Sequence, residues 1–153
     1  MFRGLVLICL FGYCLAACDY TLTITNYKKC DKKEGITVDK VTAKLNDKCN
    51  LQFTGCAKLT KPFKSIDIKY KGIKNGIPVI TGTKKGCGFK YDDFEVKCPI
   101  KSPTEYCAKP NWEFEIPKEG LGMAVGKLKG TVDVVTDGKE HFCFEGNGEI
   151  KKK

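Results

Sequence analysis

The sequence predicts an all-β protein, an immunoglobulin-like sandwich of two sheets stapled by disulfides. About seven or eight short segments alternate apolar and polar residues, and Gly, Pro, Asn and Asp signals separate them. We find no convincing amphipathic helix between these segments, and the chain contains 10 cysteines. The cysteine–tryptophan–cysteine order of true immunoglobulin domains is missing, because Trp112 follows Cys98.

A period of two places the predicted strands along the chain. They cover residues 20–24, 36–45, 63–71, 77–80, 89–100 and 111–116, followed by a hairpin within residues 123–150. The second strand changes parity between Val38 and Val41, which predicts a bulge at residues 39–40. Pro78 lacks an N–H group, which predicts either an edge position for the fourth strand or the start of that strand.

The C-terminal hairpin can be paired in two ways. A two-residue loop of Asp137 and Gly138 would pair Asp133 with Phe142 and place a carboxylate beside an aromatic ring. A three-residue loop over residues 136–138 pairs Val132 with Phe142 instead. We favour the second register, because it keeps the apolar side chains on one face.

Two small residues, Gly126 and Gly130, fall on the otherwise apolar face of this hairpin. They could leave room for a guest molecule between the sheets. They could equally mark a bulge or a close backbone approach. The sequence leaves both interpretations open.

Residues 1–17 are predicted to be a secretory signal peptide, since Arg3 precedes a short apolar run that ends in small residues. Cleavage after Ala17 retains Cys18 and leaves an even number of cysteines, as an oxidising compartment favours. The small-residue rule fits cleavage after Cys18 as well. We therefore expect one secreted domain over residues 18–153.

The basic surface consists of lysine. The formal net charge is +9, and Arg3 is the only arginine. Nucleic-acid-binding proteins favour arginine for bidentate contacts, so we expect no nucleic-acid partner. The lysines fit either a solvated coat that keeps sheet edges unpaired or a fringe attracted to anionic lipid headgroups, for example at Lys84, Lys85 and Lys90.

The sequence predicts neither an enzyme nor a metal or cofactor site. A Ser–His or Cys–His nucleophile would need His141, the single histidine, which lies in a predicted strand. C-x-x-C pairs typical of zinc sites are missing. Asp92, Asp93 and Glu95 lack the spacing of a calcium loop.

Several cysteine-containing features follow one another along the chain. They are Cys30, the close pair Cys49 and Cys56, the Cys98-Pro99-Ile100 motif and a final hairpin with Cys143. Together with the signal peptide they resemble the ML (myeloid-differentiation-related lipid-recognition) family, which includes the Niemann–Pick sterol carrier and the mite group-2 allergens. The resemblance covers nearly the whole chain after residue 17. It implies a two-sheet sandwich whose sheets part to hold a lipid in a lipid-sized apolar cavity.

The resemblance also implies a disulfide framework. The implied bridges are Cys30–Cys143, Cys49–Cys56 and Cys87–Cys98. Cys18 and Cys107 are then left over, and parity suggests that they pair with each other. The segment between Cys87 and Cys98 is longer than is usual in the family.

Apolar residues of the predicted strands would face this cavity. The inward positions are Ile66, Ile68, Tyr70, Trp112, Phe114, Ile116, Leu128, Val132, Val134, Phe142 and Phe144. Those expected near the mouth are Val79, Ile80, Phe89 and Phe94. For each residue the alternative is ordinary core packing.

Two functional hypotheses follow. The first is a secreted carrier that holds one sterol, fatty acid, phospholipid or glycolipid and passes it to a membrane or a receptor. The second is a secreted interaction protein, a receptor ligand or inhibitor, with a solid core and lysine-rich loops. An apolar space between the sheets distinguishes the two.

Overall fold

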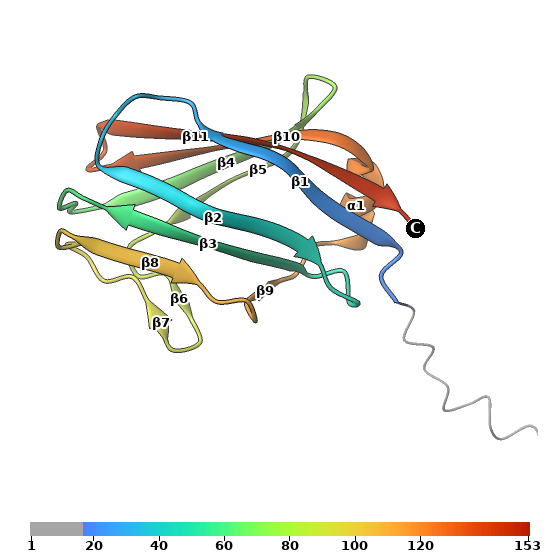
Figure 1. Ribbon diagram of the computed structural model, residues 1–153, viewed down its shortest axis with the longest axis horizontal. Helices are drawn as coiled ribbons and strands as arrows, with labels where there is room; N and C mark the ends of the chain where they lie inside the picture. The colour runs from blue at the N-terminus through green and yellow to red at the C-terminus, as the bar shows by residue number, and fades with distance from the viewer. Residues whose placement is uncertain (1–16) are drawn as a thin grey trace, which may run out of the picture.

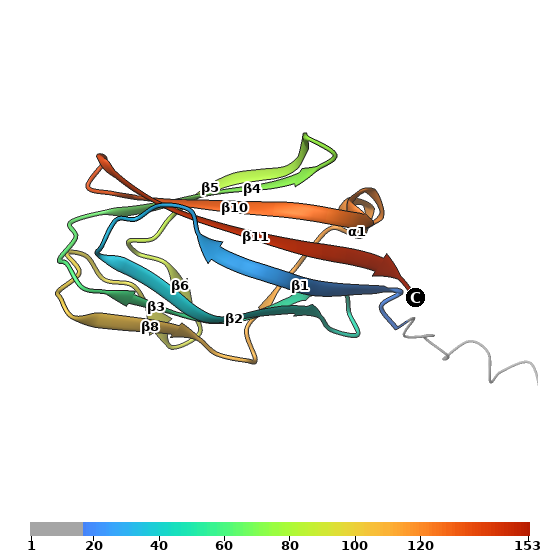
Figure 2. The ribbon, with the colours of Figure 1, turned by 45° about the horizontal axis from the view of Figure 1, so that its top comes forward.

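The computed structural model describes residues 17–153, which form two antiparallel β-sheets packed face to face (Figures 1 and 2). The predicted all-β sandwich with disulfides is confirmed. Apart from Ala17, the predicted signal peptide lies outside the described residues. Within the described part, no helical segment has the length and apolar character that crossing a bilayer requires.

The larger sheet has five strands in the order β1-β11-β10-β4-β5, and the smaller has the order β2-β3-β8 with β9 beside β3. A short hairpin of β6 and β7 lies beside β8 (Figure 1). The elements are β1 (Tyr20–Lys29), β2 (Ile36–Leu45), β3 (Leu51–Leu59), β4 (Ile66–Lys74), β5 (Ile77–Lys85), β6 (Lys90–Tyr91), β7 (Phe94–Glu95), β8 (Thr104–Ala108), β9 (Glu113–Phe114), α1 (Lys118–Ala124), β10 (Gly126–Thr136) and β11 (Glu140–Lys152).

Local sequence patterns predict three features that the structure confirms. β2 has the expected bounds. Its pairing with β3 shifts between Asp39 and Thr42, where Lys40 has a φ of 52°, and this is the expected bulge. Pro78 lies in β5, which is an edge strand of the larger sheet.

β10 and β11 form the predicted hairpin, but the favoured register is wrong by two residues. Val132 pairs with Phe144 rather than with Phe142, because the three-residue loop begins one position later than expected. Asp137 and Gly138 hold the left-handed positions of this loop, with φ values of 51° and 68°. A two-residue shift keeps each side chain on its face, so the predicted inward face is correct.

Besides β3, two further elements lie where no regular structure is predicted. β8 occupies a polar segment between Pro103 and Pro110, where the sequence predicts no strand. α1 contains two glycines, which lower its intrinsic helix propensity. Burial of Leu121 and Ala124, which are 2% and 1% exposed, stabilises this helix against the sheet.

Two of the four predicted disulfides are confirmed and two are wrong. Cys30–Cys143 and Cys87–Cys98 are confirmed. The expected Cys49–Cys56 and Cys18–Cys107 bridges are wrong, and the pairs are instead Cys18–Cys49 and Cys56–Cys107. The segment after Cys49 is a strand, β3, rather than a loop. From Leu51 to Cys56 this strand spans about 17 Å, whereas a disulfide joins Cα atoms at most about 7 Å apart.

Two separate blocks of buried side chains fill the sandwich. The first consists of Ile36, Leu59, Phe63, Ile66, Ile100, Phe142 and Phe144. The second consists of Cys18, Cys49, Leu121, Ala124 and Ile150. Along β10, Val132 and Val134 pack against the first block and Leu128 against the second. Gly130 lies between them, at the gap between the blocks.

Candidate functional site

Inward side chains of the larger sheet form rows that cross β4, β10 and β11. Ile68, Val134 and Phe142 are paired in one row, and Phe142 is fully buried. The adjacent row belongs to the same inner face, since its Phe144 is also in the first block. That row consists of Tyr70, Val132 and Phe144. Six of the predicted site residues thus come together in these two rows.

The next row in line contains only glycines. Gly72, Gly130 and Gly146 are paired with one another across β4, β10 and β11. They face inward by strand alternation, as the packed rows do. We call these three residues the glycine strip. It leaves the inner face without side chains between the two buried blocks.

Backbone geometry explains Gly126 and Gly146 but not Gly130. Gly126 has a φ of 115°, which favours glycine, so the backbone interpretation holds there. A Cβ on Gly146 would lie 3.1 Å from the carbonyl oxygen of Asn26, because β1 approaches closely. A Cβ on Gly130 would meet nothing nearer than the Gly146 carbonyl oxygen at 3.9 Å, and the residue is exposed. The space in front of Gly130 is therefore open.

Two apolar side chains are exposed although they face inward by strand alternation. Phe53 on β3 alternates with Ala57 and Leu59, which pack in the first block, yet Phe53 is 36% exposed. Ile80 on β5 pairs with Gly72 and is 43% exposed. Ile80 lies beside the strip, so its exposure indicates that solvent reaches the sheet there. Phe53 lies outside the predicted site, because its segment was expected to be a disulfide-closed loop.

An aromatic cluster covers the β8–β9 side of the sandwich. Trp112 is 4% exposed. Its ring centroid lies 4.8 Å from the ring centroid of Tyr91 and 4.9 Å from that of Phe94. The Tyr91 hydroxyl accepts a hydrogen bond from the Glu113 N–H at 2.7 Å and donates to the Glu113 carbonyl at 3.1 Å. These bonds tie the β6–β7 hairpin to β9. The cluster brings together four predicted site residues: Phe89, Phe94, Trp112 and Phe114.

The other predicted site residues lie in three places. Ile66 belongs to the first buried block. Ile116 and Leu128 pack against the second block. Val79 and Ile80 lie on the edge strand β5, which makes Ile80 the predicted residue that contacts the glycine strip most directly.

Among the described residues, three buried side-chain polar atoms lack protein partners. They are the Tyr27 hydroxyl, Trp112 Nε1 and Thr136 Oγ1. Tyr27 pairs with Gly146, so it continues the row of the strip on β1. Burial, with a contribution from the charge of Asp39, raises the pKa of Tyr27 to about 12, so its hydroxyl remains a donor at neutral pH. An unpaired buried donor is costly, and a ligand oxygen could satisfy it.

Comparison with known proteins identifies the fold. No family model matches the chain, and no curated protein matches it. Among solved structures it is similar to chicken MD-1 complexed with lipid IVa. The TM-score is 0.53 at 15% sequence identity, covering 86% of this chain and 91% of the MD-1 chain.

The chain has an MD-1-like fold. At this identity the similarity shows the fold alone. Membership of the ML family therefore stays a prediction.

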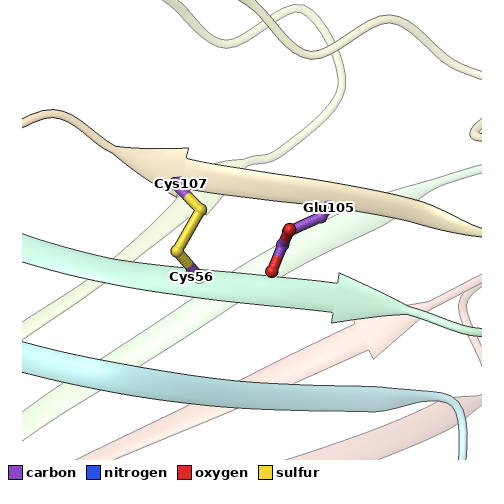
Figure 3. Close-up of side chains that lie close together, drawn as sticks. All are labelled: Cys56, Glu105 and Cys107. Atoms are coloured by element: carbon purple, nitrogen blue, oxygen red, sulfur yellow. A yellow bond between two sulfur atoms is a disulfide. The ribbon is translucent and has the colours of Figure 1, made fainter.

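The outer face of the MD-1-like sandwich carries one group of potential metal ligands among the described residues: Cys56, Glu105 and Cys107 (Figure 3). The two sulfur atoms form a disulfide. A disulfide offers no thiolate, which is the form of cysteine that binds metals. This group is therefore a structural disulfide beside an exposed carboxylate.

His141 also lies on the outer face. Its Nδ1 is 2.8 Å from the Asp133 carboxylate. Asp133 pairs with Cys143, whose sulfur is bonded to Cys30 and offers no thiol nucleophile. The absence of enzymatic activity stays a prediction.

Two hollows on the described residues lie outside the space between the sheets. One of about 430 Å³ lies beside the β1–β2 loop, between Lys29 and Thr60, and mixes acidic with basic side chains. The other, of about 260 Å³, lies where β3 ends and β8 begins. The predicted lipid-sized cavity between the sheets thus rests on the glycine strip and the exposed Ile80 beside it, and it stays a prediction.

Proposed function

We propose that this protein is an extracellular lipid carrier that binds a single lipid between its two sheets. The glycine strip is the observation that carries this proposal. Protein interiors are normally filled to crystal-like density, and at Gly130 the protein supplies no side chain of its own. Chicken MD-1, which has a similar fold, is complexed with lipid IVa in its structure, and this supports a lipid as the guest.

The chemistry of such a site is non-covalent. A sterol, a fatty acid, a phospholipid or a glycolipid would gain about 25 cal/mol for each Å² of apolar surface removed from water, before association costs. Phe53 and Ile80 would contact its apolar part. Tyr27 and Trp112 offer buried donors to its polar atoms. Four disulfides fit a protein that works in an oxidising extracellular environment.

The test fills the strip with a side chain of the protein itself. Gly130→Leu places an isobutyl group in the open space, and Gly130 has no left-handed φ that would forbid it. Thr131→Leu is the matched control, because Thr131 is the next residue on the same strand and faces outward. Each protein is secreted from eukaryotic cells and examined by native mass spectrometry, followed by organic extraction and lipid identification.

We expect wild type and Thr131→Leu to carry a lipid at near one-to-one stoichiometry and Gly130→Leu to be free of lipid. Full lipid loading of Gly130→Leu would show that the strip is not the site. Wild-type protein that stays free of lipid after incubation with sterols and fatty acids would instead favour the solid-core interaction protein.

A further inference from the structure

The β4–β5 hairpin and α1 together form an exposed apolar surface at one end of the molecule. We call Ile77, Pro78 and Met123 the apolar tip. Ile77 is 66% exposed and Met123 is 67% exposed, the highest values for large apolar side chains among the described residues. The two elements are joined, because Lys74 pairs with Ile77 and its Nζ donates a hydrogen bond to the Met123 carbonyl at 2.9 Å. Figure 2 shows the end of the hairpin close to α1.

Lysines lie beside the apolar tip on β4 and β10. On the β4–β5 hairpin the lysines closest to the tip are Lys71 and Lys74, while Lys84 and Lys85 pair with Ile68 and Asp67 at the far end of the hairpin. Lys71 precedes the tip on β4, and Lys127 follows α1 at the start of β10. Neither forms an ion pair with a carboxylate of the described residues.

Two carboxylates lie on α1 and on β11 opposite Lys127. Glu119 is in the first turn of α1 and is exposed. Glu149 is the strand partner of Lys127, and its carboxylate pairs with Lys151 at 3.1 Å. The lysines of the hairpin therefore remain the dominant charge beside Ile77.

From these exposed apolar side chains and unpaired lysines we infer that the apolar tip docks the protein onto an anionic lipid bilayer. Ile77 and Met123 enter the boundary between headgroups and acyl chains, where apolar side chains are stabilised. Lys71 and Lys127 meet the anionic headgroups, at about 1 kcal/mol for each lysine near the surface.

The composition of the surface favours a bilayer over a protein. Protein interfaces are enriched in Tyr, Trp and Arg and depleted in Lys. The apolar tip is aliphatic, its neighbours are lysines, and the described chain has no arginine. A fluid headgroup layer suits flexible, strongly hydrated ammonium groups.

The position of the tip also fits lipid exchange, and in this respect the inference rests on the proposed function. Gly72 of the glycine strip is two residues before Lys74, and Ile80 is two residues after Pro78. Docking at the tip therefore brings the open edge of the strip to the membrane. A lipid could then move between bilayer and protein over a short path.

The test measures co-sedimentation with phosphatidylcholine vesicles that contain or lack phosphatidylserine. One variant, Ile77→Ser with Met123→Ser, removes the apolar contact. A second, Lys71→Glu with Lys127→Glu, reverses the charge. The control, Lys101→Glu with Lys139→Glu, changes the net charge equally at the opposite end of the sandwich, where β8 begins and β10 turns into β11 (Figure 1).

We expect wild type and the control to partition onto the anionic vesicles with similar strength. Each tip variant should partition at least about tenfold more weakly. Native mass spectrometry of vesicle-free protein provides the second readout, in which all variants should retain lipid as the wild type does.

Three results would overturn the docking surface. They are tip variants that partition like wild type, a control whose partitioning falls as much as theirs, or a wild type that does not bind anionic vesicles. The last result would leave the tip as a surface for a protein partner. The second readout separates the two proposals, because a wild type without lipid contradicts the carrier and says nothing against the tip.

Discussion

The same three strands carry a filled row and an empty one about 13 Å apart. At Ile68, Val134 and Phe142 the inner face is packed, and Phe142 is fully buried. Four residues along each strand, at the glycine strip, the face is bare. The hydrogen-bonded ladder is continuous through both rows, so residue size alone makes the difference. The packed row stabilises the sandwich, and the strip leaves space that we assign to a guest.

The largest expected effect is at the packed row. Phe142→Ala should destabilise the protein by about 3–5 kcal/mol, because it leaves a cavity where the ring now contacts Phe63 edge-on at 6.0 Å. The measurement is urea unfolding with the disulfides intact. Gly130→Leu is the counterpart at the strip and should change the free energy of unfolding by less than about 1 kcal/mol. Equal losses for the two substitutions would mean that the strip is ordinary packed core.

The second largest expected effect comes from removing disulfides, which contribute unequally to stability. Replacing Cys30 and Cys143 with serine should lower the free energy of unfolding by about 2–4 kcal/mol, since the bridge closes a loop with a sequence separation of 113. The same change at Cys87 and Cys98 should cost less, because the separation there is 11. Denaturant midpoints of the two double variants test the order. The reverse order would show that the Cys87–Cys98 bridge at the β6–β7 hairpin contributes more to stability than the Cys30–Cys143 bridge.

The smallest expected effect is a pH dependence of stability that arises from Asp31, beside the Cys30–Cys143 disulfide. Burial raises the pKa of the Asp31 carboxyl, but hydrogen bonds from the Cys143 and Lys33 N–H groups and the charge of Lys29 outweigh it. The pKa therefore lies below its usual value of 3.8. The resulting stability is present above pH 3.8 and is lost as the pH falls through the lower folded-state pKa.

Asp31→Asn should remove this contribution. Urea midpoints measured from about pH 6 down to about pH 2 should fall less steeply for the variant than for wild type. Parallel profiles for the two proteins would show that Asp31 does not anchor the β1–β2 loop through its charge.

Local alternation was sufficient to predict the fold class and most inward faces. The parity change in β2 is a property of adjacent residues, so the bulge at Lys40 could be found without knowing its partner strand. The same reasoning identified the packed side chains of β4 and β10. Tyr27 was missed because the first strand continues past a register shift after Ile24, where simple alternation ends.

Pairing over long distances was decided only by the tertiary structure. Cys49 and Cys56 are close in sequence, yet β3 holds them apart and each finds a distant partner. The glycine strip has the same origin, because Gly72, Gly130 and Gly146 come from three strands that only their mutual register aligns. Alternation is encoded by neighbouring residues and can be read from the sequence. Register and disulfide pairing depend on which strands meet, and the packing of the whole chain decides that.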